Sequence, residues 1–462
     1  MQPAWLASLK ALVGADLCET DTTLLQEYAV DGLIPSAVLW PESAEHVAAV
    51  LQWAAGEKLA VIPCGSGTKI ALGGIPKRLD IVLSTRRLAQ ISEYDAANFT
   101  ITVGAGMTFA QLTQLAAAHM QMLPLQYPFS AASLGGLIAT NAYTPKRVRY
   151  GGVRDLLLGL RVALPSGEIA HFGGKVVKNV AGYDMCKLFL GSLGTLGIIV
   201  AATFKLSAVP ERDETSLAVF PSLEPGAAAV AQLMATQLLP SQILLLNPIA
   251  THAVAPAVTM QVVPAAALLV VNCEGMDEAV ERQLADIARI CQGHGASTVQ
   301  VLAGDAQHQL RQRLQAVTCS PPPRPSPLEG EDVGGGGIAI RLGTLPSRVY
   351  TVMDTAAQAL RSLAPGAMII GDCGVGSVRL CPRPEGSAMD AIDALLLGAL
   401  RELPGLVAGH GGYAVVETAP PEAKRQLDVW GAPPSSLALL KALKRKFDPE
   451  DILSPGRFIG GL

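Results

Sequence analysis

Near residue 63 the chain passes from a short apolar run into a glycine-rich segment, and this feature constrains the fold most. Leu59–Ile62 is predicted as a buried strand, and Pro63–Gly74 follows with the sequence PCGSGTKIALGG. Two glycines flank Ser66, so the backbone is free to turn tightly and to present several N–H groups on one side. Such groups hold a diphosphate without a clash from Cβ atoms. A plain turn between two elements explains the same residues, so other segments must decide.

Composition limits the classes of protein to which the chain can belong. Its 462 residues exceed one ordinary core, so two or three domains are expected. The net charge of −4 and an aromatic share of 5% argue against nucleic-acid binding. Hydrophobic residues make up 50% of the chain and charged residues only 16%, a balance that favours large buried interfaces.

Cysteine usage and the terminus indicate the compartment. The eight cysteines are scattered and none forms a CxxC pair, which suits a reducing cytosol and leaves no thiolate set for an iron–sulfur cluster. No apolar run reaches the roughly 18 residues of a membrane span. The first ten residues lack the basic start of a signal peptide. We expect a cytoplasmic protein.

Strand and helix signals alternate from the start of the chain to about residue 210. After a helical lead-in over residues 1–30, this alternation predicts a first α/β domain over residues 31–210. Ser43 and Thr108 are predicted to cap helices. Strands are predicted at 37–41, 59–63, 80–84 and 100–104.

A second α/β domain is predicted over residues 211–420. Its apolar runs at 217–220, 242–246 and 267–272 alternate with helical patterns. The prolines and glycines of 319–337 predict a mobile surface loop within it, with a proline-recognition ligand as the alternative. A tail, 421–462, completes the chain.

Two further segments are rich in small residues. Pro128–Ala142 contains Ser133, Thr140 and Asn141 among glycines and alanines, and Gly191–Val200 leads from a small-residue turn into an apolar strand. Small side chains let a flat ligand lie close to the backbone. Tight helix packing is the alternative for the first of these segments.

In this order, with Pro165-Ser-Gly-Glu168 before the last, the three segments resemble the FAD-binding domain of the vanillyl-alcohol oxidase (PCMH) type. The resemblance covers about residues 30–210. It implies a two-subdomain FAD-binding domain, a smaller α/β cap domain of the FAD-linked oxidase type over 211–420, and a tail that packs back on the FAD domain. The implied FAD contacts are Cys64, Gly65, Ser66, Gly67, Thr68, Lys69, Ser133, Leu134, Gly135, Gly136, Thr140, Asn141, Gly197, Ile198 and Ile199.

The resemblance also bears on how FAD is held. Some members attach the flavin through a histidine just after the first glycine loop, and here Thr68 occupies that place. We therefore expect non-covalent FAD. Lys69 is the basic residue nearest the expected diphosphate, with a solvated surface lysine as the alternative.

A finer resemblance is to the FAD-binding E subunit of glycolate oxidase. It rests on Val177–Asp184 (VKNVAGYD), on Gly191–Gly197 (GSLGTLG), and on the tail motifs Phe447-Asp-Pro449 and Ser454-Pro-Gly-Arg457. It implies an oxidoreductase subunit of a complex that converts glycolate to glyoxylate, with a catalytic flavin subunit and an iron–sulfur subunit as partners. Those partners would place the protein in the cytoplasm or at the inner face of the membrane.

The expected catalytic segment departs from the family. Where catalytic relatives carry two metal-binding histidines, Gly371–Arg379 has Asp372 and Arg379, and arginine cannot bind a metal. No metal is therefore expected, and no catalytic residue is assigned. Arg379 either binds a substrate carboxylate or marks a degenerate site. His410 is the other candidate base, with a loop histidine as the alternative.

Two other functions remain open from the sequence. One is a self-sufficient FAD-dependent 2-hydroxyacid or alcohol dehydrogenase, which would depend on His410 or Arg379. The other is a non-catalytic assembly subunit with vestigial FAD.

Overall fold

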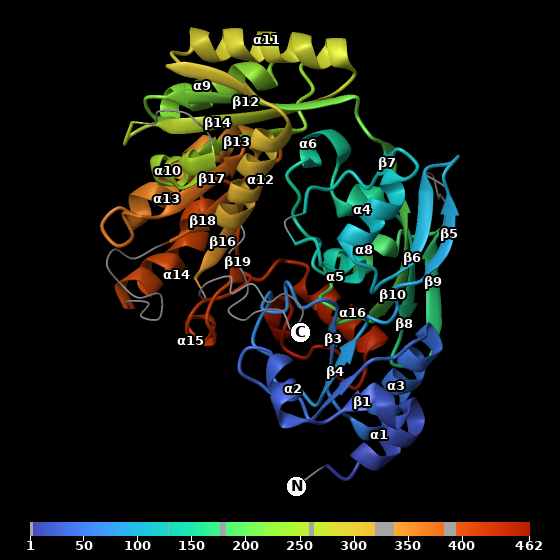
Figure 1. Cartoon of the computed structure of the whole chain (residues 1–462). Helices are drawn as coiled ribbons and strands as arrows, with labels where there is room; N and C mark the ends of the chain where they lie inside the picture. Colours follow the sequence, from blue (N-terminus) through green and yellow to red (C-terminus); the bar gives the residue numbers. More distant parts are fainter. Residues whose placement is uncertain (1–2, 128, 176–181, 258–262, 319–336, 383–393) are drawn as a thin grey trace.

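The structure is a computed structural model that describes residues 3–127, 129–175, 182–257, 263–318, 337–382 and 394–462. The predicted mobile loop lies outside these residues except at Gly337, and so does the larger part of the Val177–Asp184 motif. Two lobes are visible in Figure 1: an N-terminal lobe, residues 3–208, and a sheet lobe, residues 212–418, with the C-terminal tail between parts of the first.

A small sheet forms the base of the N-terminal lobe. Its strand order is β1-β2-β4-β3, and β2, β4 and β3 run parallel. The Ser43 hydroxyl accepts the backbone N–H of His46, so the predicted cap begins helix α3. The predicted helical lead-in also contributes β1, a strand too short to show in a hydrophobic pattern. The elements are α1 (Leu6–Val13), η1 (Ala15–Leu17), β1 (Cys18–Glu19), α2 (Thr22–Glu27), β2 (Ala37–Leu39), α3 (Ala44–Glu57), β3 (Val61–Cys64) and β4 (Ile81–Ser84).

A second, antiparallel sheet completes this lobe, with the order β5-β6-β10-β8-β9. Thr108 forms a capping box with Gln111 at the start of α4, as the sequence predicts. Strand β5 escapes the sequence pattern because its residues are exposed or half-buried. The elements are β5 (Ile91–Asp95), β6 (Thr100–Gly104), α4 (Phe109–Ala117), β7 (Gln121–Met122), α5 (Leu134–Ala139), α6 (Arg147–Tyr150), α7 (Val153–Leu156), β8 (Leu157–Ala163), β9 (Ile169–Gly173), α8 (Cys186–Phe189), β10 (Ile198–Lys205) and β11 (Ser207–Ala208).

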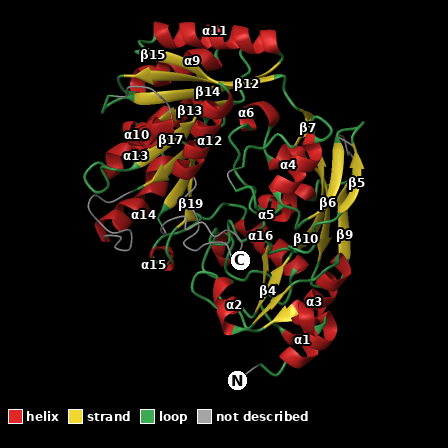
Figure 2. Ribbon diagram, in the orientation of Figure 1, coloured by secondary structure: helices red, strands yellow, loops and turns green. Residues whose placement is uncertain are grey.

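The sheet lobe is one antiparallel sheet of eight strands, in the order β15-β12-β14-β13-β17-β18-β16-β19. Helices cover both faces (Figure 2), so its strands are nearly continuous apolar runs. The elements are β12 (Arg212–Phe220), α9 (Leu223–Met234), β13 (Gln242–Leu246), α10 (Pro248–Val254), η2 (Ala255–Ala257), β14 (Ala267–Gly275), α11 (Asp277–Gly293), β15 (Thr298–Leu302), α12 (Gly304–Thr318), β16 (Ala339–Gly343), η3 (Pro346–Arg348), α13 (Val349–Leu360), β17 (Met368–Asp372), β18 (Ser377–Cys381), α14 (Ala394–Ala408) and β19 (Tyr413–Thr418).

The two faces of this sheet carry different helices. Helices α9, α11, α13 and α14 pack on one face, in a core that includes Ile243, Leu245 and Ile369. Helices α10 and α12 pack on the other, against Leu244 and Ile370. Successive side chains of a strand point to opposite faces, so neighbours in sequence belong to different cores.

The C-terminal tail returns to the N-terminal lobe, where α16 lies between its two sheets (Figure 1). Leu453 bridges to Val61 of β3, and the buried ammonium of Lys444 donates to Asp448 and to the carbonyls of Thr195 and Leu453. The elements of the tail are α15 (Pro421–Lys424), α16 (Leu437–Phe447) and η4 (Ile459–Gly461). The tail is thus part of the N-terminal core although it lies last in the chain.

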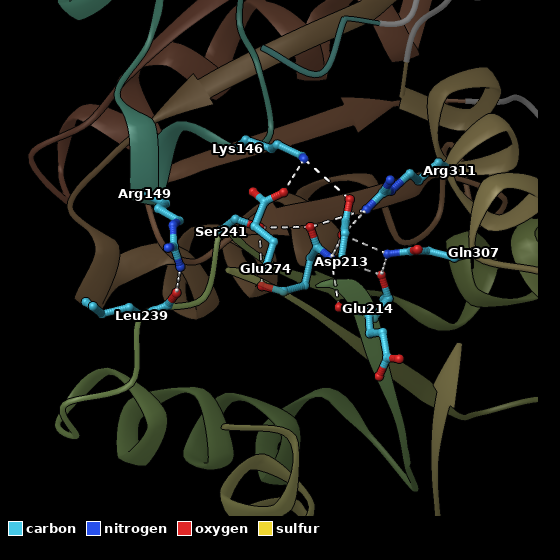
Figure 3. A network of polar contacts seen from close by, with 11 residues as sticks. Lys146, Arg149, Asp213, Glu214, Leu239, Ser241, Glu274, Gln307 and Arg311 are labelled. Atoms are coloured by element: carbon cyan, nitrogen blue, oxygen red, sulfur yellow. Dashed lines mark hydrogen bonds and ion pairs between the residues drawn. The ribbon is translucent and has the colours of Figure 1, made fainter. Parts of the chain in front are cut away.

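A buried ion cluster joins the two lobes (Figure 3). The ammonium of Lys146, at the start of α6, lies 2.5 Å from the Glu274 carboxylate of β14 and 3.6 Å from that of Asp213 of β12. Glu274 is fully buried, and Arg311 of α12 also pairs with Asp213 at 2.6 Å. Burial acts to raise the pKa of Asp213, but the two cations lower it below its usual value. This cluster ties the sheet lobe to the segment that follows α5.

Within the described ranges, no helix combines the length and the apolar character that crossing a membrane requires.

Candidate functional site

The three small-residue segments meet around one pocket, which we call the glycine-loop pocket. It encloses about 800 Å³ between protein atoms, part of it open to solvent. Sites for cofactor-sized ligands commonly have such volumes. Of the fifteen residues named above as ligand contacts, all but two line it, namely Cys64, Gly65, Ser66, Gly67, Thr68, Lys69, Ser133, Gly135, Gly136, Thr140, Gly197, Ile198 and Ile199.

The first and second segments touch at Gly65. A Cβ atom on Gly65 would lie 1.8 Å from the Ser133 Oγ atom, far inside contact distance. Gly67 has a φ of +79°, in the left-handed region that favours glycine. The Ser66 hydroxyl donates to the carbonyl of Ala131 and holds the loop against the second segment. Backbone rather than side chain therefore borders this part of the pocket.

The third segment packs against the end of β3. A Cβ atom on Gly194, where φ is +71°, would lie 2.3 Å from Pro63 Cγ. One on Gly197 would lie 2.5 Å from Val162 Cγ1 of β8. Strand β10 then begins at Ile198, so the turn and the strand start form one wall of the pocket.

Leu134 and Asn141 do not line this pocket. The Leu134 side chain is fully buried in the core beneath α5, and Asn141 is exposed just after the helix, with a φ of +44°. Both belong to a segment that borders the pocket. Leu134 lies on the side of α5 that packs into the core, since only one side of a helix can face a ligand, whereas Asn141 lies beyond the end of the helix.

Three polar or aromatic residues of the same pocket escaped the sequence reasoning: Thr85, Tyr127 and Arg457. Thr85 and Tyr127 carry no signal in a single sequence. Arg457 stands in the Ser-Pro-Gly-Arg tail motif, but nothing in the sequence shows that the tail returns to the glycine loop.

Arg457 brings an unpaired donor to the pocket. Its Nη2 group donates to the carbonyls of Ile70 and Leu72, just after the glycine loop. Its Nη1 group is buried and has no hydrogen-bond partner among the described residues. The nearby acid, Asp31, already accepts two hydrogen bonds from the buried ammonium of Lys424, at 2.7 and 2.9 Å. Two buried cations thus share one carboxylate beside the pocket.

Cys64 lies in the same wall, and burial raises the pKa of its thiol to about 11. Arg86 and Arg457 pull that pKa back only in part. The thiol therefore stays protonated at neutral pH and is not a nucleophile there.

Lys69 is not a solvated surface lysine. Its ammonium lies 3.7 Å from the Glu417 carboxylate of β19, which also binds Arg341 of β16 and Arg379 of β18, each at 2.9 Å. Burial acts to raise the pKa of Glu417, but these three cations hold it well below its usual range. Among the described residues, three cations thus gather around this one carboxylate.

Arg379 also lines a second pocket, between the sheet lobe and the segment after α5, which we call the Asp372 pocket. It encloses about 450 Å³, part of it open to solvent. Three neighbouring strands and α12 supply its walls on one side, and the N-terminal lobe supplies the other. Its lining comprises Gln126, Tyr143, Pro145, Gln242, Leu244, Leu314, Gln315, Ile370, Asp372, Ser377 and Arg379.

Asp372 and Arg379, the residues at the expected histidine positions, therefore share one pocket. Asp372 ends β17, and β17 pairs with β18 so that Ile370 lies opposite Arg379. Tyr143 lies between them, because its hydroxyl donates to the Asp372 carboxylate and its ring lies 5.3 Å from the Arg379 guanidinium carbon.

Burial determines the protonation states of Asp372 and Tyr143. It raises the pKa of Asp372 to about 7, against the opposing hydrogen bonds from Tyr143 and the backbone N–H groups of Gly374 and Val375. Burial and the Asp372 charge together raise the pKa of the Tyr143 hydroxyl well above its usual value. The carboxylate thus gains or loses a proton near neutral pH, while the phenol stays protonated.

His410, the other candidate base, lies in neither pocket. It follows α14 and its Nε2 atom lies 3.3 Å from the Thr355 hydroxyl of α13, on the face of the sheet opposite Asp372. Gly371, the residue before Asp372, faces α13, so the alternation of the strand turns Asp372 away from it. The loop-histidine interpretation fits this position.

Among the described residues, no three His, Cys, Asp or Glu side chains gather so that they could hold a metal ion.

Family models match two parts of the chain. An FAD binding domain matches residues 35–173, and the C-terminal domain of FAD linked oxidases matches residues 209–320 and 424–458. The first match spans the glycine loop and the second segment. The second match reaches into the tail that carries Arg457.

Curated relatives match nearly the whole chain or about half of it. The glycolate oxidase subunit GlcD of Bacillus subtilis (strain 168) is 28% identical over 435 residues, covering 92% of this chain and 89% of its own. The D-2-hydroxyglutarate dehydrogenase of Xanthomonas citri pv. viticola is 27% identical over 473 residues, covering 98% and 96%. The D-lactate dehydrogenase of Archaeoglobus fulgidus is 38% identical over 205 residues, covering 44% and 45%.

Solved structures share the fold. p-Cresol methylhydroxylase with bound substrate has a TM-score of 0.74 at 16% identity, over 98% of this chain and 95% of its own. An alkyldihydroxyacetonephosphate synthase has a TM-score of 0.71 at 18% identity, over 98% and 85%.

The described residues fit the FAD that these matches indicate. The glycine-loop pocket offers backbone free of Cβ atoms, as the close approach at Gly65 shows. The buried Nη1 donor of Arg457, which has no hydrogen-bond partner in the described part of the chain, suits a diphosphate, which is an anion. With both matches joined in one chain of this fold, the chain belongs to the FAD-linked oxidoreductases that carry a PCMH-type FAD-binding domain.

Proposed function

We propose that this chain is the FAD-binding subunit of a glycolate (2-hydroxyacid) oxidase or dehydrogenase complex. In that complex glycolate is oxidised to glyoxylate, and electrons pass through flavin to an iron–sulfur partner subunit. A second, catalytic flavin subunit completes the assembly. The similarity to a glycolate oxidase subunit and to two dehydrogenases of 2-hydroxy acids supports the reaction class.

The observation that carries the proposal is the junction of the two pockets. Lys69 lines the glycine-loop pocket, Arg379 lines the Asp372 pocket, and both bind Glu417. A cofactor in the first pocket therefore lies next to a cationic patch in the second. A 2-hydroxy acid is a small anion, so the patch suits it.

Each group of residues has a distinct task in this scheme. FAD is held without a covalent bond, as Thr68 implies, by the glycine loop, by Ser133, Gly135 and Gly136, and by Gly197–Ile199. Arg457 faces its diphosphate. FAD supplies a two-electron acceptor when bound. The lobe contact at Lys146 directly follows Tyr143 and Pro145, which line the Asp372 pocket.

The second candidate is a self-sufficient FAD-dependent 2-hydroxyacid dehydrogenase. The Asp372 pocket favours it, because the pocket holds both a cation for a carboxylate and a group that titrates near neutral pH. A degenerate site would have no need of either.

Anaerobic reduction separates these functions. The FAD-loaded chain is mixed with glycolate or D-lactate, alone and with a partner flavin subunit, and the flavin absorbance is followed. Bleaching only with the partner supports the complex, and bleaching of the chain alone supports the self-sufficient enzyme. A chain that binds FAD weakly or not at all would be a non-catalytic assembly subunit, and absence of bleaching in every mixture contradicts oxidation of these acids.

A further inference from the structure

A buried cluster of charges lies beside the glycine loop, and only one of its members lines the glycine-loop pocket. Its three residues come from separate parts of the chain: Asp31 from the turn after the helical lead-in, Lys424 from α15, and Arg457 from the tail. The side chains of Asp31 and Lys424 are 3% and 0% exposed, and Arg457 is as deeply buried. Among the described residues, these two buried cations have a single carboxylate between them.

Lys424 occupies both oxygens of the Asp31 carboxylate. Its ammonium donates to Oδ1 at 2.7 Å and to Oδ2 at 2.9 Å, and it also donates to the carbonyl of Ala71. An ammonium has three hydrogens, so these bonds use all of its donors. Burial lowers the pKa of Lys424, and the Asp31 charge offsets that effect only in part. Lys424 is thus fully engaged by this carboxylate and by the segment after the glycine loop.

A tight turn fixes the backbone of Asp31. Val30 and Leu33 exchange two backbone hydrogen bonds, of 2.8 and 3.0 Å. Between them, Asp31 and Gly32 have φ values of +49° and +88°. Two-residue turns with both φ values positive favour the pair Asp-Gly. Because the turn holds the backbone in place, Asp31 can exchange one cation for another only by moving its side chain.

Arg457 reaches the same cluster without an ion pair. The Asp31 charge acts to raise the pKa of its guanidinium, against the larger effect of burial, but no ion pair joins the two among the described residues. Its Nη2 group donates to the carbonyls of Ile70 and Leu72, on either side of the carbonyl that Lys424 binds. Its Nη1 donor has no partner within the described ranges. Arg457 therefore keeps one buried donor while Lys424 holds Asp31.

We propose that Lys424 is a positioning residue for FAD: by holding both oxygens of Asp31, it keeps this carboxylate from neutralising Arg457, so that the Nη1 donor stays available to the cofactor diphosphate. The inference rests on the role proposed above for Arg457 and goes beyond it, since neither Asp31 nor Lys424 lines the glycine-loop pocket. It makes FAD affinity depend on α15, the helix that directly follows β19.

The two members of the pair should have opposite effects on FAD affinity. Lys424→Met frees Asp31, whose carboxylate would then pair with Arg457 and compete with the diphosphate. The dissociation constant for FAD should rise at least about tenfold, since hydrogen bonds between charged groups are the strong ones. Asp31→Asn removes the competing charge, so this variant should bind FAD at least as tightly as the unaltered protein. A pair with only a structural role would lose affinity in both variants.

The double variant separates positioning from structure. Full-length apoprotein of each variant is titrated with FAD, and the quenching of FAD fluorescence gives the dissociation constant. Lys424→Met combined with Asp31→Asn should recover most of the affinity that Lys424→Met alone loses, because no carboxylate is left to pair with Arg457. Lys58→Met is the matched control: it removes a positive charge of the same lobe from an exposed pair with Glu450, and its constant should not change.

Thermal unfolding provides a second readout, which also serves if Lys424→Met does not fold. Asp31→Asn leaves two buried cations without their carboxylate, so bound diphosphate compensates more charge than in the unaltered protein. FAD should therefore raise the melting temperature of Asp31→Asn by more than it raises that of the unaltered protein. A smaller rise contradicts the inference.

Two further results would overturn it: a double variant that binds FAD as weakly as Lys424→Met or at least about tenfold more weakly than the unaltered protein, and an Asp31→Asn variant with weakened FAD binding. If Arg457→Gln weakens FAD binding and Lys424→Met does not, the role of Arg457 stands while this inference falls. If Arg457→Gln leaves FAD affinity unchanged, both fall. Oxidation of glycolate by the assembled complex is measured separately, so the proposed reaction is judged on its own result.

Discussion

Single residues show how backbone freedom and buried charge make a cofactor site. At Gly65 the absence of a side chain allows a contact that a Cβ atom would block at 1.8 Å from Ser133. At Arg457, by contrast, a long side chain is needed. It donates to the carbonyls of Ile70 and Leu72 and still presents a buried donor to the pocket. The two residues are far apart in sequence, but both line the glycine-loop pocket.

Replacing Arg457 should weaken FAD. Arg457→Gln removes the buried cation, and we expect the dissociation constant for FAD to rise about 10–100-fold, the range of a charge-assisted hydrogen bond. Arg457→Lys keeps the charge without the fork and should recover part of the loss. Quenching of FAD fluorescence on binding gives both constants, and an unaltered constant in Arg457→Gln would contradict the diphosphate role.

A methyl group at position 65 should also weaken FAD binding, because it changes the shape of the glycine loop. Gly65→Ala forces the loop away from Ser133, so FAD affinity should fall at least about tenfold. Gly56→Ala is the matched control, because its Cβ meets no atom within 4 Å and it lies inside α3. That control should bind FAD normally and gain up to about 1 kcal/mol of stability from helix propensity.

At the scale of elements, contacts between lobes determine the geometry of the second pocket. The segment from Tyr143 to Lys146 supplies one wall and also the central cation of the lobe contact. Strands β12 and β14 of the sheet lobe supply the carboxylates that bind the Lys146 ammonium, those of Asp213 and Glu274. A pocket between lobes is therefore only as well defined as this ion cluster.

Removing the central cation should be costly. Lys146→Met leaves Glu274 buried without its partner, and we expect a loss of about 3–5 kcal/mol in the free energy of unfolding. Arg289→Ala breaks an exposed ion pair with Asp286 on α11 and should change stability by no more than about 0.5 kcal/mol. Urea unfolding measures both, and equal losses would show that the cluster is not structural.

At the scale of the whole molecule, the tail and the sheet lobe contribute residues to sites whose other residues belong to the N-terminal lobe. The tail brings Arg457 to the glycine loop, and β19 brings Glu417 to Lys69. Both cross-lobe carboxylates, Asp213 and Glu417, are held ionised by cations of their surroundings. The assembly of the lobes therefore depends on their charge.

Acid should destabilise this assembly. Both carboxylates have folded-state pKa values below their unfolded values, so they stabilise the fold above about pH 4.5 and lose that contribution as pH falls further. We expect the melting temperature to drop steeply below about pH 4.5. In Glu417→Gln protein the drop should be shallower than in the unaltered protein. Differential scanning calorimetry across pH 3–7 tests this, and parallel curves would contradict it.

Much of the local structure follows from short stretches of sequence. Ser43 and Thr108 cap helices as predicted, and the apolar runs form strands close to the predicted bounds. The three small-residue segments and their resemblance also identify the fold and FAD. Weakly patterned elements such as β1 and β5 remain hidden, because they are short or exposed.

The sequence by itself determined where the backbone is free to turn, which residues cap helices, and that FAD is the cofactor. The first two properties depend on chemistry within a few neighbouring residues, and the third on the resemblance of the three small-residue segments to a known family. Only the tertiary structure decided that Asp372 shares a pocket with Tyr143, that Glu417 joins the two pockets, and that Arg457 reaches the glycine loop. The reason is that these contacts depend on strand order and on the return of the tail, and neither leaves a local signal in the chain.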